Sequence, residues 1–395
     1  MIRRVLAVGA GPEQLHPIRM AKAMGLQVAA VDRDPGAPGF ALADIWRPID
    51  VADEAAVIAF AREVGVDAAL PAPIGRFLTT VAAVNAALGL RGVQPAAAAA
   101  CADKRLAHDI LSAAGVPVAA QIAIDDPAQL PEAVAKVGAP CVVKPAFGSG
   151  SRGVALCATT DQALALAPSG HVALGESWLV EAALQGTEYG VDAAIYADVF
   201  TGLLVREKVM TPPPDRQELT YIHPPRAPQA TTVAVLNVVE AAARAIGLTD
   251  CLINADVMVD AAGRASLIEI SGRAPGNNIT TRIYPAIYGS DLIGAALTAL
   301  GEGGPLAHPG EGRPVVFAFL PTPAGRVVSV GALPKTPGLL DIEVRMAVGD
   351  RLAPLRTGTD AMARGWLMTT GGDSHEALAN AQAALAALEI EIERV

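Results

Sequence analysis

The chain has 395 residues, enough for two or three domains with substantial cores. Its formal net charge of −10 argues against nucleic acid as a partner, because binding along a phosphate backbone requires a basic face. No apolar run approaches the roughly 18 residues of a membrane span, and the first residues lack the pattern of a signal peptide. We therefore expect a cytoplasmic protein without membrane association.

The first segment alternates strands and helices. We expect strands at residues 5–8, 27–31 and 68–71, and helices at 17–24 and 53–64. This order is typical of a doubly wound parallel sheet. Gly9-x-Gly11 followed by Asp32 imitates a dinucleotide-binding fingerprint, but Gln14 stands at the third glycine position. NAD binding therefore competes with a Rossmann-like domain whose glycine turn faces a different small molecule.

The next segment contains two lysines in distinctive settings. The alanine-rich stretch 95–102, a connection or the start of a helix, leads into Asp103-Lys104 and an amphipathic helix. An apolar strand at 141–143 then runs into Lys144-Pro145 and a loop rich in Gly and Ser. Glycines let backbone N–H groups fold closely over phosphate oxygens. Lys104 as a solvated helix residue and the loop as an ordinary hairpin turn are the alternatives.

Acidic residues mark the strands that follow. The apolar strand 178–180 ends at Glu181, and Glu188 begins another strand. Backbone groups from Glu181 to Leu184 can contact adenine, and the Glu188 carboxylate can accept both ribose hydroxyls. The alternative is that both acids are solvated strand ends.

Residues 251–260 and 265–270 predict a β-hairpin around 261–264. Asp256 and Glu269 can point to the same face of that hairpin. Two facing carboxylates in apolar strands repel each other and are costly to bury. A Mg²⁺ ion held by these acids and by phosphates resolves the conflict, with Mn²⁺ as the alternative ion.

In this order the parts resemble the ATP-grasp superfamily, and within it the carboxylate–amine ligases related to the L-amino acid ligases. Biotin carboxylase and the purine-biosynthesis enzymes of the superfamily are more distantly similar. The resemblance covers nearly the whole chain. It rests on the segments 103–104, 114–117, 142–145, 148–153, 181–188, 256, 269–277, 349–355, 365–371 and the helix from 374.

The resemblance implies a mixed α/β and α+β fold. A Rossmann-like domain at 1–98 would precede a two-part ATP-grasp domain at 99–305, with a smaller lid-containing part at 99–185 and a metal- and substrate-binding part at 186–305. A small C-terminal α+β domain would span 306–395. A homodimer is expected because relatives often dimerise.

The resemblance also implies residue roles. Arg273, Lys144 and Glu269 would be catalytic, with Arg273 steadying the transferred phosphoryl group and the later tetrahedral intermediate. Asp256 and Glu269 would bind Mg²⁺. ATP would be bound by Lys104, Lys144, Ser149, Gly150, Ser151, Gly153, Glu181, Ala182, Leu184 and Glu188. The substrate would be contacted by His223, Arg273, Gly276, Asn277 and Arg282, although Arg282 is equally typical of an exposed structural arginine and a lone loop histidine is rarely catalytic.

The expected reaction joins a small-molecule carboxylate to an amine, both amino acids or their derivatives, through an acyl phosphate. Two residues depart from the family pattern: Asp256 stands where many relatives have glutamate, and Ser271 where many have asparagine. These departures keep two alternatives open. One is an ATP-dependent carboxylase or carboxylate-phosphorylating enzyme, and the other is a nucleotide-binding regulatory protein without turnover.

Overall fold

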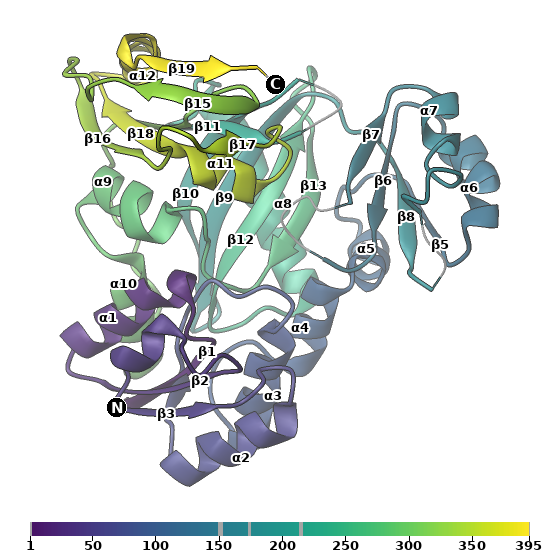
Figure 1. Ribbon diagram of the computed structural model, residues 1–395. Coiled ribbons are helices and arrows are strands. Elements are labelled where there is room, and N and C mark those ends of the chain that lie inside the picture. Colours follow the sequence, from purple (N-terminus) through teal and green to yellow (C-terminus); the bar gives the residue numbers. More distant parts are fainter. Residues whose placement is uncertain (1, 149–152, 173–174, 213–215, 395) are drawn as a thin grey trace.

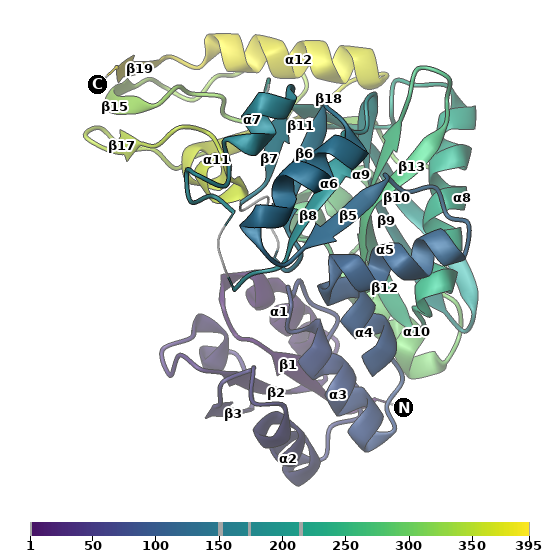
Figure 2. The same ribbon diagram turned by 90° about the vertical axis from the view of Figure 1, so that its right-hand side faces the viewer.

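The structure is a computed structural model, and it describes residues 2–148, 153–172, 175–212 and 216–394. Within these residues the chain forms four sheets with helices packed against them (Figures 1 and 2). The mixed α/β and α+β fold expected from the sequence is confirmed.

The N-terminal sheet is entirely parallel, as the alternation of strands and helices predicts. Its strands lie in the order β3 (Ile45–Pro48), β2 (Gln27–Asp32), β1 (Arg4–Val8) and β4 (Ala68–Ala69). The accompanying helices are α1 (Leu15–Ala23), α2 (Glu54–Val64) and α3 (Leu78–Leu88). Asp53 caps α2 by accepting the Ala56 N–H, and Gly65 ends that helix in the left-handed conformation.

The glycine turn after β1 is held by its own neighbours. Asp32 Oδ2 accepts the Ala10 N–H at 2.9 Å, and Gln14 Oε1 accepts the Gly11 N–H at 3.1 Å within the 3-10 turn η1 (Pro12–Gln14). The Gln14 side chain lies over Gly9, where a Cβ would be 3.4 Å from its Cδ. Asp32 and the glycine turn, which together imitate a dinucleotide fingerprint, are thus hydrogen-bonded to each other. This favours a Rossmann-like domain whose glycine turn faces a small molecule other than NAD.

A small antiparallel sheet stands beside the core on the right of Figure 1. Its strands are β5 (Gln121–Ile124), β8 (Trp178–Ala182), β6 (Cys141–Pro145) and β7 (Ala155–Cys157), with α6 (Leu130–Val137) and α7 (Thr160–Leu164) on one face. Two helices, α4 (Pro95–Ala102) and α5 (Lys104–Ala113), precede it. β6 and β7 pair as a hairpin, so the loop after Lys144 is also the connection of that hairpin.

The central sheet has eight strands and runs through the middle of the molecule. Their order is β13 (Ala265–Ser271), β12 (Cys251–Val259), β9 (Thr187–Tyr196), β10 (Val199–Met210), β11 (Glu218–His223), β14 (Val315–Phe319), β18 (Gly365–Thr370) and β16 (Leu339–Val344). The expected hairpin of residues 251–270 is confirmed as β12 and β13. The last three strands come from the C-terminal region, so that region extends the sheet of the core.

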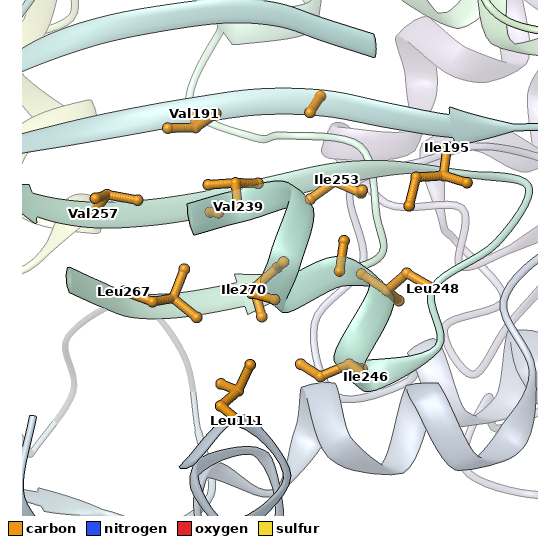
Figure 3. Close-up of a cluster of buried hydrophobic side chains, with 14 of the residues drawn as sticks. Leu111, Val191, Ile195, Val239, Ile246, Leu248, Ile253, Val257, Leu267 and Ile270 are labelled. Carbon is orange, nitrogen blue, oxygen red and sulfur yellow. The ribbon is translucent and has the colours of Figure 1, made fainter. Parts of the chain in front are cut away.

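Helix α8 (Gln229–Ile246) covers one face of this sheet. Its Val239 and Ile246 pack with Val191 of β9, Ile253 of β12 and Ile270 of β13, and Leu111 of α5 closes the same cluster (Figure 3). Because side chains alternate along a strand, the neighbours of these residues point to the opposite face. The candidate site lies on that opposite face.

The remaining elements complete the C-terminal half. They are η4 (Ile279–Ile283), α9 (Tyr284–Tyr288), α10 (Leu292–Glu302), β15 (Gly325–Val330), β17 (Arg351–Leu352), α11 (Gly358–Arg364), α12 (Ser374–Ala387) and β19 (Ile390–Glu393). Of the helices in the described ranges, none is by itself long and apolar enough to cross a membrane. By length and composition, only Ile279–Tyr288 together with Leu292–Glu302 would pass, as a pair bent by 91°.

Candidate active site

Strand register gathers acidic side chains on the open face of the central sheet. Glu188 of β9 and Asp256 of β12 lie on neighbouring strands, and Glu218 begins β11 after a register shift in its pairing with β10. One carboxylate oxygen from each of these three residues lies within 4.8 Å of the others. Glu269 is the register partner of Asp256 on β13 and is exposed. Three acids therefore surround one point on the sheet, and Glu269 lies on the strand next to Asp256.

A buried ammonium group lies inside this acid cluster. Lys208 Nζ is 2.5 Å from Glu218 Oε1, 2.6 Å from Asp256 Oδ1 and 3.2 Å from Glu188 Oε1, and Lys208 is only 6% exposed. Arg216 adds a second contact to Glu188 at 2.8 Å. One buried lysine thus neutralises only part of the negative charge.

The pKa values reflect this excess of acid. The pKa of Asp256 is raised to about 7; burial is the largest cause, Glu188, Glu269 and Glu218 contribute to the rise, and Lys208 opposes it. Burial by itself would lower the pKa of Lys208, but the surrounding carboxylates raise it well above its usual value. The cluster is a strongly cation-attracting site.

The donor set fits a hard divalent cation. Mg²⁺ and Mn²⁺ take carboxylate oxygens, and Glu188 and Glu218 add donors to the pair Asp256 and Glu269 that the sequence indicates. Glu188, which was expected to bind ribose, lies among these acids, and its role at the ribose stays a prediction. The sequence interpretation gave Lys208 no role; it follows Arg206 and Glu207 in a strand, and no local signal distinguishes it from an exposed lysine.

A buried ion pair forms the floor next to the cluster. Arg206 of β10 pairs with Asp192 of β9, both almost fully buried, and Asn254 Nδ2 donates to Asp192 Oδ1 at 2.9 Å. The guanidinium lies 5.3 Å from the centre of the Tyr221 ring. It also covers Gly190, where a Cβ would be 2.7 Å from Arg206 Nη2. This network, which the sequence did not reveal, holds the floor rigid.

The two lysines expected at the phosphates lie close to residues 146–148, which follow β6. Lys104 Nζ donates to Gly148 O at 2.8 Å, and Lys144 Nζ is 2.7 Å from Glu181 Oε2. Burial lowers the pKa of Lys104, Glu269 opposes that effect, and Lys144 adds to it. Lys144 and Glu269 are thus both near enough to Lys104 to influence its charge, and the role of the two lysines at phosphates stays a prediction.

The other residues expected at the nucleotide have mixed outcomes. Ser149, Gly150 and Ser151 lie outside the described residues. Gly153 has φ +73°, and a Cβ there would be 3.0 Å from Pro145 Cγ, so this position requires glycine. The Ala182 N–H donates to Ala120 O at 2.9 Å, and Leu184 is half-buried in the connector beyond β8. Their role at adenine stays a prediction.

The loop after β13 carries Arg273 and the expected substrate residues. Asn277 and Asn278 both have positive φ, 51° and 64°, a strained conformation that is frequent at functional sites. Asn277 Nδ2 donates to Glu218 Oε2 at 3.4 Å, which links this loop to the acid cluster. Within the described residues no carboxylate forms an ion pair with Arg273, whose Nη1 donates to Ala274 O at 2.9 Å.

Two further residues that were expected to contact the substrate have structural partners. His223 Nδ1 lies 2.9 Å from Val205 O, and burial lowers the pKa of its imidazole. Arg282 Nη1 is 3.3 Å from Asp341 Oδ2, and its guanidinium lies 5.6 Å from the centre of the Trp366 ring. These contacts favour the structural interpretation of Arg282.

The parallel N-terminal sheet, the small antiparallel sheet that carries Lys144 and the acid-lined central sheet can be compared with known protein families. Residues 137–282 match the model of the ATP-grasp domain, and residues 318–393 match that of the L-amino acid ligase C-terminal domain 2. The chain thus contains an ATP-grasp domain followed by a C-terminal domain of the L-amino acid ligase type, and the resemblance drawn from the sequence is confirmed.

Individual proteins agree with this assignment. The chain is 33% identical over 187 residues to the phosphoribosylamine–glycine ligase of Mycobacterium bovis, which is 45% of this chain and 44% of that protein. The chain thus spans less than half the length of that curated relative. The fold is similar to the L-amino acid ligase from Bacillus licheniformis, with a TM-score of 0.81, 19% identity and coverage of 99% of both chains. It is also similar to phosphoribosylglycinamide synthetase from Anaerococcus prevotii, with a TM-score of 0.75, 17% identity and coverage of 99% and 100%.

Proposed function

We propose that this protein is an ATP-dependent ligase that joins a carboxylate to an amine through an acyl phosphate, with ADP and phosphate as products. The single observation that carries the proposal is the cluster of Glu188, Glu218 and Asp256 on the central sheet, in a chain whose residues 137–282 match the ATP-grasp domain. The C-terminal domain of the L-amino acid ligase type supports amino acids as substrates.

The proposed reaction has two chemical steps, and different residues act in each. In the first, the substrate carboxylate attacks the γ-phosphorus of ATP, and Lys104 and Lys144 offset the charge on the phosphates. In the second, an amine attacks the acyl carbonyl, phosphate leaves, and Arg273 stabilises the oxyanion that forms. The lid loop after Lys144 excludes water from the acyl phosphate.

A divalent ion would be held by Asp256 and Glu269, with Glu188 and Glu218 beside them, and when bound it would neutralise charge on the phosphates. Lys208 contacts three of these acids in the described structure. We propose that its ammonium group turns toward the nucleotide phosphates once the ion is bound. This exchange keeps the buried carboxylates compensated in both states.

Phosphate release measured across a panel of carboxylic acids, with hydroxylamine as the trap, tests the proposal. An acyl phosphate gives a hydroxamate together with ADP. If no carboxylate elicits ATP cleavage while ATP still binds, the ligase proposal is wrong, and a nucleotide-binding protein without turnover is the better description. Bicarbonate-dependent ADP release would point instead to the carboxylase alternative, and AMP formation would contradict the acyl phosphate.

A further inference from the structure

A cavity lies between elements of the N-terminal region and the central sheet, and the proposed reaction makes no use of it. Its walls are mostly apolar and include Leu78 of α3, Leu252 of β12 and Leu300 of α10. The space open to the centres of water molecules is about 50 Å³, and one water needs about 10–15 Å³ by the same measure. The cavity is therefore large enough for a few water molecules or for one small solute.

Two buried polar atoms belong to residues on the walls and lack a hydrogen-bond partner among the described residues. They are the hydroxyl oxygen of Tyr196, the last residue of β9, and Oδ1 of Asn85 in α3. Tyr196 is 0% exposed and Asn85 is 1% exposed. A polar atom left unpaired at such a depth is costly, so native proteins nearly always supply it with a partner. The cavity is the space from which one partner can reach both residues.

The chemistry of the two unpaired atoms is complementary. Asn85 Nδ2 donates to Val93 O at 3.0 Å, and a Cβ at Gly92 would lie 2.5 Å from the same Nδ2, so the orientation of this amide is fixed. Oδ1 is thus left as an acceptor. Burial raises the pKa of Tyr196 well above its usual value, so the hydroxyl keeps its proton and can donate. A matching occupant must both accept and donate a hydrogen bond.

The charged groups at the cavity favour a neutral occupant. Asp250 Oδ1 is 2.5 Å from Arg91 Nη2, and Asp250 Oδ2 accepts from Arg91 Nε at 3.1 Å, so these two side chains compensate each other. Arg273 also borders the cavity, and its Nη1 donates to Ala274 O. The unpaired Oδ1 of Asn85 carries a partial negative charge that repels an anion. Water satisfies the donor and the acceptor without adding charge.

We propose that this cavity binds ordered water, which accepts a hydrogen bond from the Tyr196 hydroxyl and donates one to Asn85 Oδ1. The water joins α3, which packs against the N-terminal sheet, to β9 of the central sheet. Gly272 also lines the cavity, necessarily with backbone atoms, and it directly precedes Arg273. The hydration site therefore lies at the seam between two parts of the chain, beside the segment that carries Arg273. This inference does not depend on the proposed function.

A high-resolution crystal structure of the full chain tests the site. We expect ordered water within about 3.2 Å of the Tyr196 hydroxyl and of Asn85 Oδ1. Crystals soaked in bromide and crystals pressurised with xenon identify other occupants, because bromide marks an anion site and xenon enters a dry apolar cavity. A bromide or xenon peak in the cavity, or no density in it, overturns the proposal.

Two substitutions measure the link in solution by urea unfolding. Tyr196→Phe removes the donor, and Asn85→Ala removes the acceptor. Because both groups bind the same water, the double variant should lose less than the product of the two single losses, by about threefold to tenfold in the unfolding equilibrium constant. Asn85→Ala also removes the bond to Val93 O, so the coupling is the informative quantity and the single loss is not.

Tyr189→Phe is the matched control. Tyr189 is also almost completely buried on β9, but it lies near the start of that strand and on the opposite face. Its loss combined with Asn85→Ala should be the product of the single losses. The hydration bridge is disproved if Tyr196 is coupled to Asn85 no more strongly than Tyr189 is.

Discussion

Replacing Lys208 by methionine tests the charge balance of the acid cluster most directly. The substitution keeps much of the side-chain volume and removes the ammonium group that contacts Glu188, Glu218 and Asp256. These carboxylates would then face one another without their central cation. We expect Lys208→Met to lower stability strongly in the presence of a chelator.

The magnitude follows from burial. Lys208 is 6% exposed and lies within 2.6 Å of two carboxylates, and removing one partner of such a buried pair costs about 3–5 kcal/mol. For a cooperative unit of roughly 200 residues, this corresponds to a fall of about 6–20 °C in the unfolding temperature. Protonation of Asp256 relieves part of the repulsion, so the lower half of that range applies at acidic pH.

The assay is thermal unfolding with EDTA and then with a series of Mn²⁺ concentrations. Without the ammonium group the cluster should bind Mn²⁺ more tightly than in the wild type, and Mn²⁺ at 100 times its Kd stabilises by about 2.7 kcal/mol. The difference in unfolding temperature between Lys208→Met and the wild type should therefore become smaller as Mn²⁺ is added. Lys22→Met, which breaks an exposed pair with Asp44, is the control and should cost less than about 1 kcal/mol.

The reasoning is refuted if Lys208→Met in EDTA is as stable as Lys22→Met. It is also refuted if Mn²⁺ stabilises the variant less than it stabilises the wild type. Either result would mean that Lys208 does not compensate the cluster.

Three further predictions concern other parts of the structure. Gly190→Ala places a methyl group 2.7 Å from Arg206 Nη2 and should destabilise the protein by about 1–3 kcal/mol in urea unfolding. Glu269→Gln should abolish ADP formation while the unfolding free energy changes by less than about 0.5 kcal/mol, because the side chain is exposed; unchanged turnover would remove Glu269 from the metal site. Burial raises the pKa of Cys101 and of Cys157 to about 11, so at pH 8 both thiols should react slowly with Ellman's reagent until the protein is denatured, and rapid native labelling would contradict this.

Two matched substitutions serve as controls for Gly190→Ala and Glu269→Gln. Gly304→Ala adds a methyl group where nothing lies within 4 Å and should leave stability unchanged. Glu302→Gln changes an exposed acid at the end of α10 and should leave ADP formation unchanged.

Much of the fold was predictable because its signals are local. The parallel N-terminal sheet follows from alternating apolar strands and capped helices, and the hairpin of β12 and β13 follows from two apolar runs around Gly263. The stretch 95–102, expected to be a connection or the start of a helix, is helix α4, as its alanines favour. The extension of the core sheet by β14 was not predictable, because strand order depends on contacts distant in sequence.

The residues of the candidate site were also predictable only where their signals are local. Lys104, Lys144, Asp256 and Glu269 were identifiable because each stands in a distinctive local pattern. Lys208 was not, because nothing near it in sequence shows that a strand register carries it into a group of acids. Its importance comes from burial among charges, which is a property of the folded molecule.

By itself, the sequence determined the class of fold and the acid pair on one hairpin, and it singled out Lys104 and Lys144 as candidates for a phosphate site. Only the tertiary structure decided that Lys208 lies within the acid cluster and that Arg206 and Asp192 form its floor. It also decided that Glu13 of the N-terminal turn lies beside Gly276 in the loop of Arg273, and that Asn85 and Tyr196 line one cavity. The physical reason is that side-chain alternation and turn chemistry act over a few residues, whereas electrostatic partners are set by which strands and domains pack together.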